Sequence, residues 1–208
     1  MKPTLLIALL LGMAIPAMGE TILFSQQRPG VLPAGWVCGV TGHGNPNWTI
    51  EPDSTGPNLG NVLRQSGSGD FPWCVKQDVS LADGFVEARF KPVAGREDQA
   101  GGVVWRWKDG NNYYVARANA LEGNVSLYYT TGGRRHTIRY RDAPVAPGTW
   151  HLLRVEFTGP RIRVALDGKL YIDTSDEHIP GAGAIGVWTK ADSVTLFDAI
   201  SFGSNDTR

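Results

Sequence analysis

The sequence lacks an excess of charge of either sign. Lys and Arg number 20 and Asp and Glu number 20, which gives a formal net charge of zero. Proteins that bind nucleic acids or other polyanions carry a basic excess. The short basic stretches at residues 134–136 and 139–141 are typical of the solvated face of a strand. We therefore expect no nucleic-acid partner.

The sequence also lacks an apolar run long enough to span a membrane. The longest run, residues 5–15, has about eleven residues, whereas a spanning helix needs about 20. Lys2 precedes this run and a small-x-small pattern at residues 17–19 follows it, as in a cleavable signal peptide. An uncleaved anchor is the alternative. We expect residues 1–19 to be a signal peptide and residues 20–208 to be one secreted or periplasmic domain that does not span the membrane.

Cysteine is scarce, since Cys38 and Cys74 are the only two. No Cys-x-x-Cys spacing or nearby His cluster accompanies them, which argues against a redox or metal pair. In an exported chain two cysteines are expected to be oxidised to each other. A disulfide between them would stabilise the fold by about 4 kcal/mol in the chain-entropy model.

Helical periodicity is hard to find, while 26 Gly, 13 Pro and 7 Trp indicate many turns and aromatic strands. After residue 84, alternating apolar segments recur at intervals of about ten residues, with turn residues between them. The strands expected there are residues 84–91, 101–107, 113–118, 125–130, 136–140, 150–158, 161–166, 184–189 and 193–202. The earlier part is expected to hold one edge strand near residues 21–25 and long loops. This pattern predicts an all-β fold, an antiparallel two-sheet sandwich.

Alternation assigns the two faces of the strand at residues 113–118. Tyr113, Val115, Arg117 and Asn119 share one face, and the small alanines share the other. The first face holds more polar groups than a half-buried strand needs. We therefore expect binding residues on it.

Four stretches carry motifs of a known family: residues 109–122, residues 150–156 with the pattern Trp-His-x-Leu-Arg-Val-Glu, the Asp-Gly-Lys at residues 167–169, and residues 186–198. Through them the chain resembles the concanavalin A-like lectin/glucanase superfamily, specifically its bacterial laminin-G-like and DUF1080 (3-keto-disaccharide hydrolase-like) branch. The resemblance covers about residues 84–203. It implies a jelly-roll sandwich, a fold that hosts lectins, glycosidases and adhesive modules alike.

Aromatic side chains could serve such a fold as sugar platforms, because a pyranose stacks its C–H groups on an aromatic plane. The candidates are Trp105, Trp107, Tyr113, Tyr128 and Trp188. The alternative for each is a core position, since large aromatics in a sandwich are mostly buried. Trp188 shares its strand face with Lys190, so both readings stay open for it. Trp150 is assigned to the core.

Polar candidates gather at the end of one strand and in its following loop, where binding residues tend to lie. They are Arg117, Asn119 and Glu122. With Lys190 and Asp192 of the later segment they are predicted to converge on one groove. The alternative for Arg117 is a structural ion pair with Glu122 or Asp192, because a half-buried guanidinium needs a carboxylate partner.

Catalysis would need paired carboxylates, which the family's glucanases carry on one strand as Glu-x-Asp-x-x-Glu. That spacing is absent, and the acidic stretches at residues 96–98 and 174–177 are expected to be solvated loops. Glu122 with Asp192 is the one carboxylate pair considered for catalysis.

No cofactor is required, but the resemblance implies a structural calcium between the first and last strands. Asp198 matches its C-terminal ligand, whereas residues 22–26 offer no acidic partner. Asp198 could instead accept backbone hydrogen bonds at the start of the chain.

Three function classes remain. The first is a secreted, lectin-like domain that binds a carbohydrate or glycoconjugate. The second is a glycoside-active enzyme related to 3-keto-disaccharide hydrolases, and the third is a laminin-G-like protein-interaction module. A binding domain needs only a platform and a polar rim, whereas an enzyme needs a poised acid or base. The first class is therefore preferred.

Overall fold

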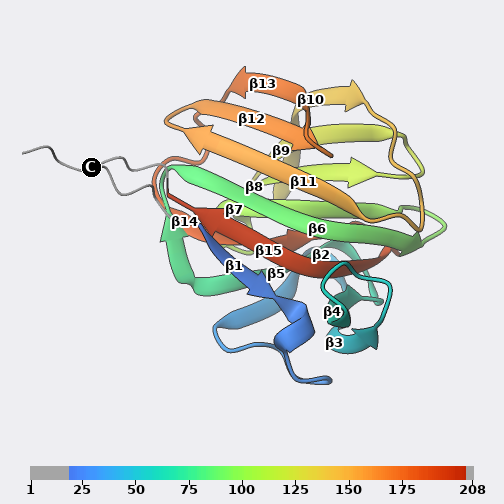
Figure 1. Cartoon of the computed structure of the whole chain (residues 1–208). Coiled ribbons are helices and arrows are strands. Elements are labelled where there is room, and N and C mark those ends of the chain that lie inside the picture. The colour runs from blue at the N-terminus through green and yellow to red at the C-terminus, as the bar shows by residue number, and fades with distance from the viewer. Residues whose placement is uncertain (1–18, 205–208) are drawn as a thin grey trace, which may run out of the picture.

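The structure, a computed structural model, describes residues 19–204 as two antiparallel β-sheets stacked face to face (Figure 1). The expected signal peptide lies outside the described residues except for Gly19. Within residues 19–204 the helical content is one 3-10 turn, η1 (Phe24–Gln26). No helix in that range is long and apolar enough to cross a membrane. The predicted all-β sandwich is confirmed.

Sheet A has eight strands. Seven of them lie side by side in the order β13 (Lys169–Ser175), β12 (Arg161–Leu166), β11 (His151–Thr158), β6 (Gly84–Ala94), β15 (Val194–Gly203), β4 (Gly60–Gln65) and β3 (Trp48–Asp53). The eighth, β1 (Glu20–Leu23), pairs with β15. The two ends of the described chain therefore meet in one sheet.

Sheet B has seven strands, which lie in the order β10 (Arg134–Asp142), β9 (Asn124–Thr131), β8 (Asn112–Asn119), β7 (Ala100–Asp109), β14 (Gly183–Trp188), β5 (Ser68–Leu81) and β2 (Trp36–Asn45). Because β14 inserts between β7 and β5, a late segment of the chain lies beside early ones. This crossover places the segment after Trp188 next to the loop between β6 and β7.

Every strand expected after residue 84 is present, with its ends shifted by a few residues. The expectation of mostly loops before that point is wrong, because β2 to β5 occupy it. Gly39 and Pro72 hide the pattern in β2 and β5. A Cβ at Gly39 would lie 2.6 Å from the Trp73 ring, so the packing there requires glycine. The strand β13 was missed because it is an edge strand that buries Ile172 alone.

The main core lies between the sheets. Leu153 and Phe157 on β11 and Tyr114 on β8 belong to it. Trp105 on β7 packs there too, with its ring centroid 5.2 Å from that of Tyr114 and 5.8 Å from that of Phe157. Trp150 is half-buried instead, because it precedes β11 and its Nε1 donates to the carbonyl of Thr55 at 2.7 Å. Its predicted core position is wrong.

The outer face of sheet B is buried as well. Tyr113 and Val115 form a second apolar cluster there with Trp73, Tyr128 and Trp188. The alternation assigned to β8 is thus confirmed, but both of its faces are covered. The outer face is covered by the tip of the β7–β8 hairpin.

That tip folds across the outer face of sheet B. Arg106 has a φ of 46°, and the register of β7 against β8 shifts in the same stretch; such a bulge bends a hairpin. Thr41 on β2 donates to the carbonyl of Gly110 and bonds the Tyr113 hydroxyl at 2.8 Å. Since β14 and β5 separate β7 from β2, these contacts mean that sheet B is strongly curled.

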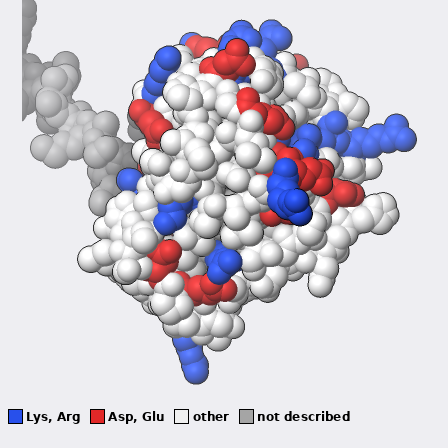
Figure 2. Space-filling view, turned by 90° about the vertical axis from the view of Figure 1, so that its right-hand side faces the viewer, with Lys and Arg blue, Asp and Glu red and all other residues white. Residues whose placement is uncertain are grey.

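Charge is distributed evenly over the surface that Figure 2 shows. Acidic and basic side chains are interspersed there among a majority of uncharged residues. This agrees with a formal net charge of zero.

The predicted disulfide is present between Cys38 and Cys74. The two residues face each other in the pairing of β2 with β5, so the bond fastens the edge strand of sheet B to its neighbour. Residues 19–204 contain no free cysteine.

Replacing Cys38 and Cys74 together by Ala should lower the free energy of unfolding by about 2 to 4 kcal/mol, because the unfolded chain gains entropy. Urea unfolding of the purified protein measures this loss. Wild-type protein with a reductant should unfold at the midpoint of the double variant. An unchanged midpoint in both cases would contradict a stabilising bond.

Candidate functional site

Three strands of sheet B bring the two predicted site segments together. Arg117 on β8 pairs with Gly102 on β7, and Gly102 pairs with Trp188 on β14. A Cβ at Gly102 would lie 3.3 Å from the Trp188 ring, so the indole packs directly against the backbone of β7. The two segments therefore share one face of one sheet.

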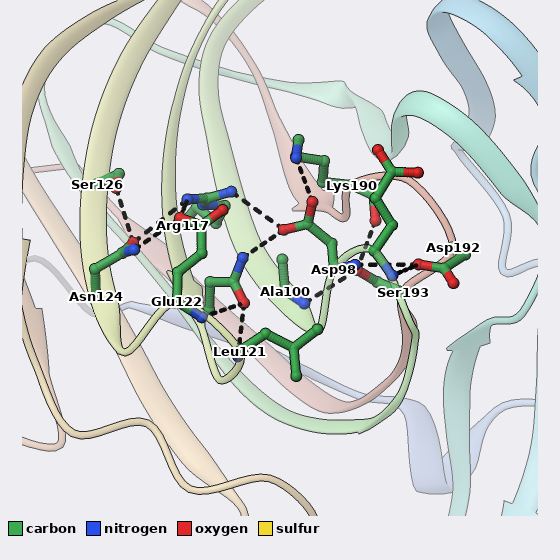
Figure 3. A network of polar contacts seen from close by, with 12 residues as sticks. Asp98, Ala100, Arg117, Leu121, Glu122, Asn124, Ser126, Lys190, Asp192 and Ser193 are labelled. Carbon is green, nitrogen blue, oxygen red and sulfur yellow. Dashed lines mark hydrogen bonds and ion pairs between the residues drawn. The ribbon is translucent and has the colours of Figure 1, made fainter.

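The carboxylate of Asp98 lies at the centre of a polar network on this face (Figure 3). Asp98 is 0% exposed. Its Oδ1 accepts a hydrogen bond from Asn119 Nδ2 and lies 3.4 Å from Arg117 Nη1, and its Oδ2 accepts one from Lys190 Nζ. Burying a carboxylate is costly unless such donors surround it. The expectation that residues 96–98 are solvated is therefore wrong for Asp98.

Arg117 is 1% exposed and has a second carboxylate partner. Its Nη2 donates to Glu122 Oε2 at 2.5 Å, and Asn124 Nδ2 donates to the same oxygen at 2.7 Å. The structural ion pair that was the alternative for Arg117 is thus formed with Glu122. The ion pairs among residues 19–204 include none between Arg117 and Asp192.

Asp192 shapes the loop that carries Asp98. Its carboxylate accepts backbone N–H bonds from Arg96 at 2.7 Å, Glu97 at 3.0 Å and Asp98 at 3.1 Å. Burial alone would raise the pKa of Asp192, but these N–H groups lower it below its ordinary value of 3.8. Asp192 is therefore an ionised anchor for the loop.

Glu122 is held in its ionised form as well. Partial burial would raise its pKa, but the hydrogen bond from Asn124 and the charges of Arg117 and Lys190 lower it. A general acid in glycoside cleavage needs a raised pKa, near the working pH. Glu122 and Asp192, the carboxylates considered for catalysis, both lack this property.

Three of the aromatic candidates are closed to a sugar, and the buried position that was the alternative for each of them is confirmed. Trp105, Tyr113 and Trp188 are each 0% exposed. Trp105 lies between the sheets, and the hairpin tip covers Tyr113. Trp188 is stacked under Phe71, with ring centroids 5.9 Å apart and planes 15° apart. Phe71, which is half-buried, is the ring that reaches the surface here.

An open groove of about 390 Å³ lies beside Phe71. Its lining residues come from β2, β5, the β6–β7 loop and the segment after β14; they are His43, Gly44, Ser68, Gly69, Asp70, Phe71, Glu97, Lys190 and Ala191. Lys190 joins this groove to the Asp98 network. A hollow of about 220 Å³ on sheet A contains none of the predicted site residues.

Sequence reasoning missed three residues of this region: Asp98, Phe71 and Arg135. The guanidinium carbon of Arg135 lies 4.2 Å from the centre of the Tyr128 ring. Phe71 lies in a strand where the sequence pattern predicts a loop, and Arg135 lies in a basic stretch that the pattern predicts to be solvated. Gly95, with a φ of 143°, signals a tight turn before Asp98. Nothing local shows that this turn buries a carboxylate.

Asp198 is buried on β15, and its carboxylate accepts hydrogen bonds from the side chain of Asn58 at 2.5 Å and its backbone N–H at 3.4 Å. Asn58 lies between β3 and β4, so the expected partner at the start of the chain is wrong. Residues 19–204 hold no group of three or more His, Cys, Asp or Glu placed to bind a metal. Calcium also takes backbone and amide carbonyl oxygens as ligands, so the structural calcium at Asp198 stays a prediction.

Asp98→Ala should lower the free energy of unfolding by about 3 to 5 kcal/mol, because it leaves Arg117 and Lys190 without their shared acceptor. Glu97→Ala, one residue earlier and exposed, should change it by less than about 0.5 kcal/mol. Urea unfolding of both variants provides the comparison. Similar effects of the two substitutions would rule out a central role for Asp98.

Asp192→Asn should lower the free energy of unfolding by about 1 kcal/mol at pH 7, with solvent screening keeping the loss small. Because the pKa of Asp192 is lowered by folding, its contribution is present above its ordinary pKa and is lost as the pH falls through the folded value. Urea unfolding at pH 7 and at about pH 2.5 should show the variant and wild type converging in acid. An equal loss at both pH values would refute this role.

No family model matches the chain. The levanase of Bacillus subtilis (strain 168) is 25% identical over 142 residues, which are 67% of this chain and 19% of the levanase. The chain thus matches a small part of that relative's length.

Several solved structures share the fold. A carbohydrate-binding module, CBM66, from Bacillus subtilis has a TM-score of 0.67 at 22% identity, covering 82% of this chain and 96% of the module. The laminarinase of Rhodothermus marinus has a TM-score of 0.62 at 15% identity, covering 89% and 96%. The β-glucanase of Bacillus licheniformis has a TM-score of 0.59 at 14% identity, covering 90% and 98%. These likenesses establish for this chain a jelly-roll sandwich fold of the concanavalin A-like type.

Proposed function

We propose that residues 20–208 form one secreted or periplasmic domain that binds a carbohydrate in the groove beside Phe71. The observation that carries the proposal is the groove itself. It places a half-buried aromatic ring next to charged side chains on a rigid polar wall. The disulfide supports an oxidising compartment.

The groove offers the two contacts that a sugar ring needs. Phe71 can stack on the C–H face of a ring, while Lys190, Asp70 and Glu97 can pair with hydroxyls around it. Lys190 is fixed by Asp98, and Asp70 by an N–H bond from His43 at 2.8 Å. Side chains that are already fixed lose little entropy on binding.

The similar proteins support the same function and suggest which glycan to test. CBM66 is named as a carbohydrate-binding module, and this chain covers 96% of it. The levanase is named for its action on levan. We therefore take levan oligosaccharides as the first glycan, and β-glucan oligosaccharides as the second, because two structural neighbours are named for glucan hydrolysis.

A glycoside-active enzyme of the DUF1080 branch is the second candidate. It would need a carboxyl group kept protonated near neutral pH, whereas the lowered pKa values of Glu122 and Asp192 favour a binding domain.

A laminin-G-like protein-interaction module would need a broad apolar patch. The exposed large apolar residues on the described surface instead lie on separate segments; they are Val31, Val37, Leu59, Val93, Leu121, Tyr140 and Leu170.

Phe71→Ala should weaken glycan binding by about 10- to 100-fold, the loss expected for a buried aromatic anchor. Phe85→Ala is the matched control, since Phe85 is also half-buried but lies on β6 of sheet A. Isothermal titration calorimetry with levan and β-glucan oligosaccharides measures both variants. Wild-type protein that binds no glycan, or an equal effect of both variants, would refute the proposal.

A further inference from the structure

Arg135, on the edge strand β10, lies over an aromatic floor on the outer face of sheet B. Its guanidinium carbon is 4.2 Å from the centre of the Tyr128 ring, 4.6 Å from that of Phe71 and 5.7 Å from that of Trp188. Phe71 also lines the groove. Arg135 therefore packs against the ring that a bound sugar would contact.

This arginine has no anionic partner. Beside the groove, Arg117 forms ion pairs with Asp98 and Glu122, and Lys190 forms one with Asp98. Within residues 19–204, no ion pair involves Arg135. Its Nη1 is buried without a hydrogen-bond partner in the described structure. Cation–π contacts return part of the cost of burying it, but leave Nη1 without an acceptor in the described structure.

Asp98 and Glu122 are bonded to the two cations that neighbour Arg135. Arg117 is neutralised by Asp98 and Glu122, and Lys190 shares Asp98. Arg135 takes no part in these ion pairs. Arg117 Nε is also buried without a partner in the described residues. Arg135 and Arg117 thus both keep an N–H group without an acceptor in the described residues.

We propose that Arg135 sets the specificity of the groove by binding the carboxylate of a uronic-acid residue. The inference rests on the proposed carbohydrate binding. A carboxylate matches the planar guanidinium fork with two parallel hydrogen bonds, which a single hydroxyl does not. The sugar ring then lies on Phe71 and its carboxylate reaches Arg135.

The rim of the groove limits this preference to an isolated acidic residue. Asp70 and Glu97 line the same groove and repel a second carboxylate. The groove therefore suits a neutral glycan with a single uronate branch rather than a polyuronate.

A matched pair of ligands tests this: xylotriose, and xylotriose bearing one glucuronic acid. Wild type should bind the acidic ligand at least about tenfold more tightly than the neutral one at low salt, and the preference should shrink as salt screens it. Arg135→Met should reduce the preference to less than about twofold. Arg135→Lys, which keeps the charge but not the fork, should give an intermediate preference.

Arg134→Met is the control, because Arg134 is the preceding residue of the same hairpin and is exposed; it should keep the wild-type preference. Thermal melts check that each variant is folded. Equal binding of the two ligands would overturn the inference and leave the proposed function standing. Binding of neutral levan oligosaccharides alone would do the same. An unchanged preference in both Arg135 variants would also overturn it. If wild type binds no glycan at all, the proposed function is wrong, and so is the inference that rests on it.

Discussion

The geometry of the groove depends on the burial of one carboxylate, that of Asp98. A charge with no exposure to water persists only if donors surround it. Here they come from Asn119 and Arg117 on β8 and from Lys190 after β14. Asp192 holds the backbone of the Asp98 loop from the other side. Parts of the chain that are distant in sequence are thereby fixed at one end of sheet B, and the groove opens next to them.

The curl of sheet B decides how much of this face a ligand can reach. The bulge at Arg106 sends the tip of the β7–β8 hairpin across the sheet to Thr41 on β2, which buries Tyr113. At the other end, Phe71 and Arg135 cover Trp188. The outer face of sheet B therefore has a buried apolar centre and one exposed edge, at the groove beside Phe71. Binding is expected at that edge.

Periodicity and the spacing of turn residues located nearly all strands after residue 84; strands such as β6 and β11 bury alternate side chains. Periodicity missed β2 and β5, in which glycine and proline replace the alternating residues and the partner strands supply the stability. At the site, alternation placed Arg117 and Asn119 on the same face of β8. Whether that face is open depends on the bulge at Arg106 and the register of distant strands, which no local pattern encodes. The burial of Asp98 was not predicted for the same reason, because it too depends on contacts between segments that are distant in sequence.

The most direct test of this account is a nitrogen-15 NMR titration of the assigned domain with the glycan that binds it. The account predicts that the largest shift changes fall on the backbone amides of Gly69, Phe71, Lys190 and Ala191, which line the groove. It predicts little change on the outer face of sheet A, around Arg154 and Arg163. Shift changes centred on that outer face, with the groove unaffected, would contradict it.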